Sequence, residues 1–89
     1  MKFETSKKFD KLVFKIKDKE ALKKLKGLIM RISEAKSIND IPNMTAMVGY
    51  PGYFRIKTGD YRLGIELDGD VVWLLYFGKR DESTYKDFP

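Results

Sequence analysis

The sequence predicts a two-layer α+β fold in which an N-terminal β-strand and a helical hairpin pack on an antiparallel β-sheet. Three observations support this prediction. Apolar residues recur at helical spacing between residues 6 and 32, apolar and polar residues alternate over residues 53–77, and two glycine-containing turns interrupt that alternation. A chain of 89 residues without cysteine is expected to form a single domain, residues 1–89, around one modest core.

The first part of the chain predicts one short strand and two helices. Residues 1–5 alternate weakly and are expected to form an edge strand. Ser6 and Asp18 are suitable N-caps for the two helices, which residues 15–18 would connect. Apolar residues then follow the spacing of a buried helix face (Phe9, Leu12, Val13 and Ile16; then Ala21, Leu22, Leu25, Leu28, Ile29 and Ile32). Both faces need a sheet to cover them.

The second part of the chain predicts the sheet. Residues 44–48 are a candidate short strand within a region punctuated by proline, glycine and asparagine. Three alternating strands follow, over residues 53–57, 61–67 and 71–77, and Thr58-Gly59-Asp60 turns the first hairpin. Asp68-Gly69 is expected at the two central positions of a type I′ turn. That register places Glu66 opposite Val71, Gly64 opposite Trp73 and Arg62 opposite Leu75.

This register divides the side chains of the sheet between two faces, because successive residues of a strand point to opposite sides. The face that the helices should cover carries Phe54, Ile56, Leu63, Ile65, Leu67, Val72, Leu74 and Tyr76. The open face carries Arg55, Lys57, Arg62, Glu66, Trp73 and Phe77. Several fixed cations on an open sheet face form an anion site, and phosphate is the anion that we expect there.

Composition restricts the chemistry. The chain has no cysteine and no histidine, which excludes disulfides, thiolate chemistry and histidine-based acid–base catalysis. We expect no metal and no other cofactor. The net charge of +5 arises in residues 1–36, which contain twelve Lys and Arg against five Asp and Glu. No segment is apolar enough for a signal peptide or a membrane span, so we expect a cytoplasmic protein without a membrane partner.

Three segments, in sequence order, carry a resemblance to a known family: Tyr53-Phe-Arg-Ile-Lys57, Gly59-Asp-Tyr-Arg-Leu63, and Phe77-Gly-Lys-Arg-Asp81 followed by Tyr85. The chain resembles the RelE/ParE superfamily of toxins from type II toxin–antitoxin systems, over nearly its whole length. It is more similar to the RelE-like mRNA interferases than to the gyrase-poisoning ParE branch. The resemblance implies a RelE-like fold and metal-independent cleavage of mRNA in the ribosomal A site by attack of the 2′-hydroxyl. It also implies contacts with ribosomal RNA and a cognate antitoxin.

The resemblance also implies roles for particular residues. The implied catalytic residues are Lys57, Arg62, Arg80 and Tyr85, and the implied substrate-binding residues are Arg55 and Lys79. The family usually has lysine at the position of Arg55, and a guanidinium cannot accept a proton, so Lys57 is the better general base. Like-charged neighbours favour the neutral form of a lysine, as a base requires. Arg80 would act on the 5′-oxygen, which is the leaving group, and Tyr85 would stack on a base or orient the 2′-hydroxyl.

Other interpretations remain open at the level of sequence. The strand cations can be the solvated face of a sheet, and a toxin of the same fold can act without catalysis, as a gyrase poison or as an inactive RNA-binding relative. Lysines on the solvent faces of the helices would bind RNA in a salt-dependent way in any of these cases. They are Lys7, Lys8, Lys11, Lys15, Lys19, Lys23 and Lys26.

Overall fold

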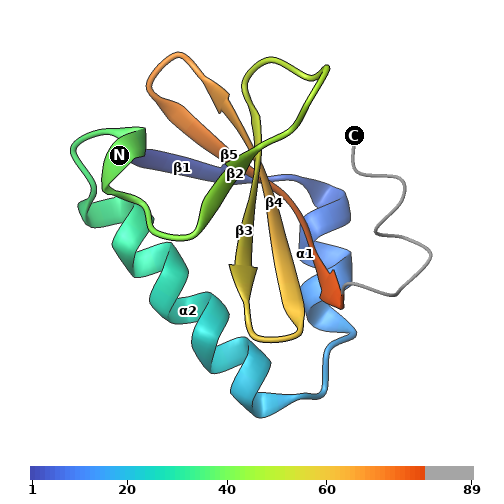
Figure 1. Cartoon of the computed structure of the whole chain (residues 1–89). Coiled ribbons are helices and arrows are strands. Elements are labelled where there is room, and N and C mark those ends of the chain that lie inside the picture. The colour runs from blue at the N-terminus through green and yellow to red at the C-terminus, as the bar shows by residue number, and fades with distance from the viewer. Residues whose placement is uncertain (80–89) are drawn as a thin grey trace.

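A five-stranded sheet of order β1-β5-β4-β3-β2 organises the molecule (Figure 1). The computed structural model describes residues 1–79. The elements are β1 (Lys2–Thr5), α1 (Lys7–Phe14), α2 (Lys19–Glu34), the 3₁₀-helix η1 (Ile38–Asp40), β2 (Met44–Ala46), β3 (Tyr53–Thr58), β4 (Tyr61–Asp68) and β5 (Val71–Lys79). Strands β2 to β5 form the predicted antiparallel meander. Because β1 pairs in parallel with β5, the complete sheet is mixed.

Both helices begin at the residues that the sequence predicts as N-caps. The Ser6 side chain accepts a hydrogen bond from the Phe9 amide at 3.1 Å. The Asp18 carboxylate accepts from the amides of Glu20 and Ala21 at 3.0 and 3.2 Å. Each cap satisfies amide groups that have no partner within their own helix. None of the helices in the described part of the chain is long and apolar enough to cross a membrane.

The core lies between the two helices and one face of the sheet. Figure 1 shows α1 beside β5 and α2 running diagonally past β3. Phe9 of α1 and the apolar face of α2 contribute to the same buried cluster as the middle of the sheet. The cluster includes Ala21, Leu25, Leu28 and Ile32 from α2, and Ile56, Leu63, Ile65, Val72 and Leu74 from the strands. The predicted helix-facing side of the sheet is therefore confirmed for these residues.

The turn between β4 and β5 differs from the prediction. Asp68 pairs with Val71, so Gly69 and Asp70 occupy the two central positions. Gly69 has φ of 61°, and Asp70 is not among the residues with positive φ. A type I′ turn needs positive φ at both positions, whereas glycine at the first alone is the type II′ pattern. The predicted register was therefore wrong, and Glu66 lies opposite Trp73 instead of Val71.

A β-bulge in β5 exchanges two aromatic side chains between the faces. Gly64 pairs with Tyr76 and Ile65 pairs with Leu74, so Leu75 has no partner in the register. An extra residue inverts the alternation beyond it. Phe77 consequently joins the core and stacks on Tyr61, with ring centroids 5.1 Å apart. Tyr76 lies on the opposite face, and it is only 1% exposed. The prediction that put Phe77 on the open face was wrong, and Tyr76 is buried as predicted but on the other face of the sheet, because strict alternation cannot reveal an inserted residue.

Candidate functional site

The sheet face opposite the helices carries the predicted cations in two neighbouring cross-strand rows. In the first row Lys57 of β3 lies opposite Arg62 of β4. In the second row Arg55 of β3 lies opposite Gly64. Arg55 and Lys57 are two residues apart on the same strand, so they share this face at a spacing of roughly 6.6 Å. We call this surface the open face.

Lys57 and Arg62 present their charges in different ways. Lys57 is exposed, whereas Arg62 is only 8% exposed. Nη1 of Arg62 donates to the carbonyl oxygens of Gly59 at 3.1 Å and Tyr61 at 2.9 Å. Like charges directly opposite each other in a sheet are unfavourable, and these two acceptors stabilise the arginine in spite of that. Arg62 is therefore a fixed cation, and Lys57 is the cation that projects into solvent.

The row of Arg55 is shaped by the absence of a side chain at Gly64. Arg55 is half-buried on β3, with Thr45 of β2 opposite it on one side and Gly64 on the other. Tyr76 of β5 follows Gly64 in the same row. The next row along the strands contains Tyr53, Glu66 and Trp73, all half-buried. The open face thus changes from basic at Lys57 to aromatic and acidic at Glu66.

Lys79 does not join this group. It pairs with Tyr61, whose side chain belongs to the helix-facing core. It lines a small surface pocket together with the acidic residues Asp18, Glu20 and Asp60. The bulge at Leu75 explains this position, because it turns Phe77 and Lys79 to the helix side of the sheet.

Two further predicted site residues, Arg80 and Tyr85, lie outside the described residues. The structure therefore brings together Arg55, Lys57 and Arg62 among the predicted site residues that it describes. Within residues 1–79, no group of three acidic side chains lies where it could hold a metal ion.

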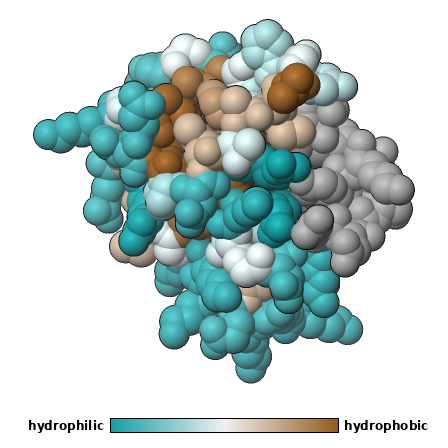
Figure 2. All heavy atoms as spheres, viewed as in Figure 1, coloured by the Kyte–Doolittle hydropathy of each residue, from teal (hydrophilic) through white to brown (hydrophobic). Residues whose placement is uncertain are grey.

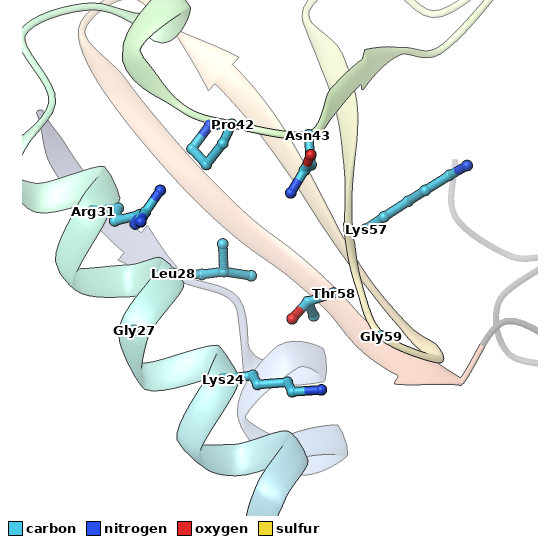
Figure 3. A pocket seen from close by; sticks show the side chains of 9 residues that line it. All are labelled: Lys24, Gly27, Leu28, Arg31, Pro42, Asn43, Lys57, Thr58 and Gly59. Atoms are coloured by element: carbon cyan, nitrogen blue, oxygen red, sulfur yellow. The ribbon is translucent and has the colours of Figure 1, made fainter.

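A second basic region, which the sequence reasoning missed, lies between α2 and the β3–β4 turn. It is a cleft of about 430 Å³, which we call the α2 cleft (Figure 3). Its lining residues are Lys24, Gly27, Leu28, Arg31, Pro42, Asn43, Lys57, Thr58 and Gly59. The signal was present in the sequence, since Lys24, Gly27, Leu28 and Arg31 have the i, i+3, i+4, i+7 spacing of one helix face. Figure 2 shows hydrophilic residues covering the lower part of this view, over α2, and apolar surface gathered above it.

Comparison with known proteins identifies the class to which this fold and this basic face belong. No model of a known protein family matches the chain. The chain is 37% identical over 68 residues to the curated toxin RelE3 of Methanocaldococcus jannaschii. This match covers 75% of this chain and 76% of that toxin. The fold matches a chain in the crystal structure of a RelB–RelE antitoxin–toxin complex from Methanococcus jannaschii, with a TM-score of 0.80, 29% identity and full coverage of both chains.

More distant structures share the fold alone. A chain in the complex of the Escherichia coli toxin RelE with a peptide of the antitoxin RelBc matches with a TM-score of 0.63 at 20% identity, over 97% of this chain and 90% of that chain. The chain belongs to the RelE family of toxins.

Proposed function

We propose that this protein is the toxin of a type II toxin–antitoxin pair and cleaves mRNA in the ribosomal A site without a metal ion. The observation that supports the proposal is the gathering of Arg55, Lys57 and Arg62 on the open face of a RelE-family fold. Attack on a phosphodiester builds negative charge on the phosphoryl oxygens, and preorganised cations stabilise that charge. Arg62 is preorganised by its two carbonyl acceptors.

In the proposed reaction the 2′-hydroxyl attacks the adjacent phosphorus and the bond from phosphorus to the 5′-oxygen breaks. Neutral Lys57 takes the proton of the 2′-hydroxyl. Arg55 and Arg62 stabilise the charge on the non-bridging oxygens, Arg80 stabilises the departing 5′-oxygen, and water supplies the proton that this oxygen takes up. Tyr85 stacks on a base or orients the 2′-hydroxyl. The products are a 2′,3′-cyclic phosphate and a free 5′-hydroxyl.

In this proposal Lys79 binds RNA but does not contact the phosphate that reacts. Its position beside Asp18, Glu20 and Asp60 separates it from the three cations of the open face. We propose for Lys79 a contact with RNA at the end of the sheet, apart from the reacting phosphate.

The test is cleavage of a defined mRNA by the purified protein, with and without programmed ribosomes, read by primer extension. We expect cleavage only with ribosomes, and fragments that end in a 2′,3′-cyclic phosphate, the product of 2′-hydroxyl attack. Lys57→Ala should abolish cleavage while remaining folded, whereas Lys23→Ala, a change at an exposed position of α2, should not. Intact mRNA on programmed ribosomes at excess toxin would refute the proposal, and DNA breaks on expression would then favour a gyrase poison.

A cognate antitoxin is the second partner that we propose. Solved complexes of related folds, RelB–RelE and DinJ–YafQ, contain an antitoxin with the toxin. The net charge of +5 favours a partner rich in acidic residues. Co-expression with the open reading frame adjacent to its gene should restore growth and give a complex that co-purifies.

A further inference from the structure

The α2 cleft is lined by basic side chains that the proposed cleavage reaction does not use. Figure 3 shows Lys24 extending from α2 toward the β3–β4 turn, and Arg31 on the same side of the helix. A Cβ built on Gly59 would lie 3.1 Å from Nζ of Lys24, so the ammonium group lies directly over that turn. Among the described residues that line the cleft, none is acidic. The cleft therefore presents two cations without a carboxylate in its wall.

Gly27 keeps the space between these cations open. It lies between Lys24 and Arg31 on the same face of α2. Glycine inside a helix costs about 1 kcal/mol relative to alanine. A Cβ at Gly27 would meet nothing within 4 Å, so packing among the described residues does not require glycine there. Its effect on the fold is to leave the floor of the cleft free of a side chain.

The opposite wall supplies polar groups and a path to the open face. Asn43 and Thr58 line this wall, and their side chains can donate hydrogen bonds. Strand β2 pairs with β3 as far as Ile56, and the Lys57 amide donates to the Asn43 carbonyl oxygen at 3.4 Å, so β3 forms the edge of the sheet from Thr58 onward. Lys57 borders the cleft, but Figure 3 shows its side chain pointing away from the cleft. A strand of RNA that reaches Lys57 can therefore pass over this edge and enter the cleft.

We propose that the α2 cleft binds a phosphodiester group of RNA through Lys24 and Arg31, in addition to the phosphate on the open face. The inference rests on the proposed function, because that function identifies the anion. An enzyme that acts on ribosome-bound mRNA is surrounded by the phosphates of mRNA and ribosomal RNA. The site is separate from the reacting phosphate. Its loss should weaken binding and leave the chemical step intact.

The test compares two double variants that remove equal charge. Lys24→Gln with Arg31→Gln alters the cleft, whereas Lys17→Gln with Lys36→Gln alters exposed lysines on either side of α2 that do not line it. Binding of a short fluorescent single-stranded RNA is measured over a range of salt concentrations. Each phosphate neutralised on a single strand contributes about 0.7 to the slope of log affinity against log salt, so loss of the one phosphate in the cleft should lower the slope by about 0.7 and the affinity by about tenfold. The control variant should lose less than half as much.

A third variant separates shape from charge. Gly27→Leu fills the floor of the cleft without changing charge and should also weaken RNA binding, whereas Gly27→Ala should weaken it less. Urea unfolding of each variant checks that the fold is retained. Equal losses in the two double variants, or unchanged binding in Gly27→Leu and in the cleft variant, would overturn the inference.

Two further measurements identify the source of the phosphate and separate this inference from the proposed function. Weaker binding of the cleft variant to vacant ribosomes assigns the phosphate to ribosomal RNA, and weaker binding only to mRNA-programmed ribosomes assigns it to mRNA. If the parent protein does not cleave mRNA but only the cleft variant loses RNA affinity, the proposed function is refuted and the proposed RNA site in the α2 cleft is supported. If the cleft variant loses antitoxin affinity and keeps RNA affinity, the cleft binds an acidic protein instead and the inference is wrong.

Discussion

Replacing Arg62 should reveal how much stability the open face draws from one of its own cations. The Arg62 side chain is 8% exposed, and Nη1 makes two hydrogen bonds to carbonyl oxygens, at 3.1 and 2.9 Å. In Arg62→Met the buried aliphatic stem is kept and the hydrogen bonds are lost. A hydrogen bond to a charged group contributes about 1.5–3 kcal/mol, and two that share one nitrogen together contribute about 2–3 kcal/mol. Relief of repulsion from Lys57 returns about 0.5 kcal/mol. The net loss is about 2 kcal/mol.

The assay is thermal and urea unfolding followed by far-UV circular dichroism. For a chain of this size, 1 kcal/mol corresponds to about 4–8 °C in Tm, so Arg62→Met should unfold about 8–16 °C below the parent. Lys57→Met is the matched control, because Lys57 lies opposite Arg62 and is exposed. It should change stability by less than about 0.5 kcal/mol. If Arg62→Met unfolds within about 2 °C of the parent, the hydrogen bonds to the carbonyl oxygens do not stabilise the fold. Arg62 would then contribute only its charge to the open face.

Three other predictions concern the base, the cleft and the bulge. Lys57→Arg should keep charge and binding but lose most of the single-turnover cleavage rate on programmed ribosomes, since guanidinium cannot take the proton; an unchanged rate would make Lys57 a phosphate clamp. Gly27→Ala should raise the free energy of unfolding by about 1 kcal/mol in urea titrations, because the added methyl meets open space; no gain would mean that the helix needs glycine for another reason. Deleting Leu75 removes the inserted residue of β5 and should exchange the faces of Tyr76 and Phe77, lowering stability by about 3 kcal/mol or more; a variant that unfolds at the parental temperature would show that the core accepts either aromatic residue.

The sequence was sufficient for α1, α2 and the strands of this fold, which depend on local patterns, but not for the 3₁₀-helix η1. The caps at Ser6 and Asp18, the two helix faces and the four strands of the meander all follow from spacing within a few residues. The pairing register of β4 with β5 could not be predicted from local patterns. Asp68-Gly69 and Gly69-Asp70 are both acceptable hairpin centres by composition, and only packing of the whole sheet selects between them.

The candidate site was predictable where strand alternation is regular and not beyond the bulge. Arg55 and Lys57 on β3 and Arg62 on β4 share the predicted face because no bulge separates them. Lys79 lies after the inserted Leu75, so regular alternation does not predict its place beside Asp18, Glu20 and Asp60. The α2 cleft lies between a helix face and a turn that is distant in the sequence. The spacing of apolar residues predicts the buried face of a helix but not the part of the sheet that this face will contact.

The parallel pairing of β1 with β5 has a consequence for how the toxin is made. Lys2 pairs with Val71 and Thr5 with Leu74, so the first of the described strands cannot pair until the last of them has been synthesised. Until β5 has left the ribosome, the nascent chain lacks Val72 and Leu74 of the core as well as the partner of β1. Contacts between residues so distant in sequence form late in folding. The sheet therefore cannot assemble in the order of synthesis, and the β1 edge stays unpaired until β5 is available.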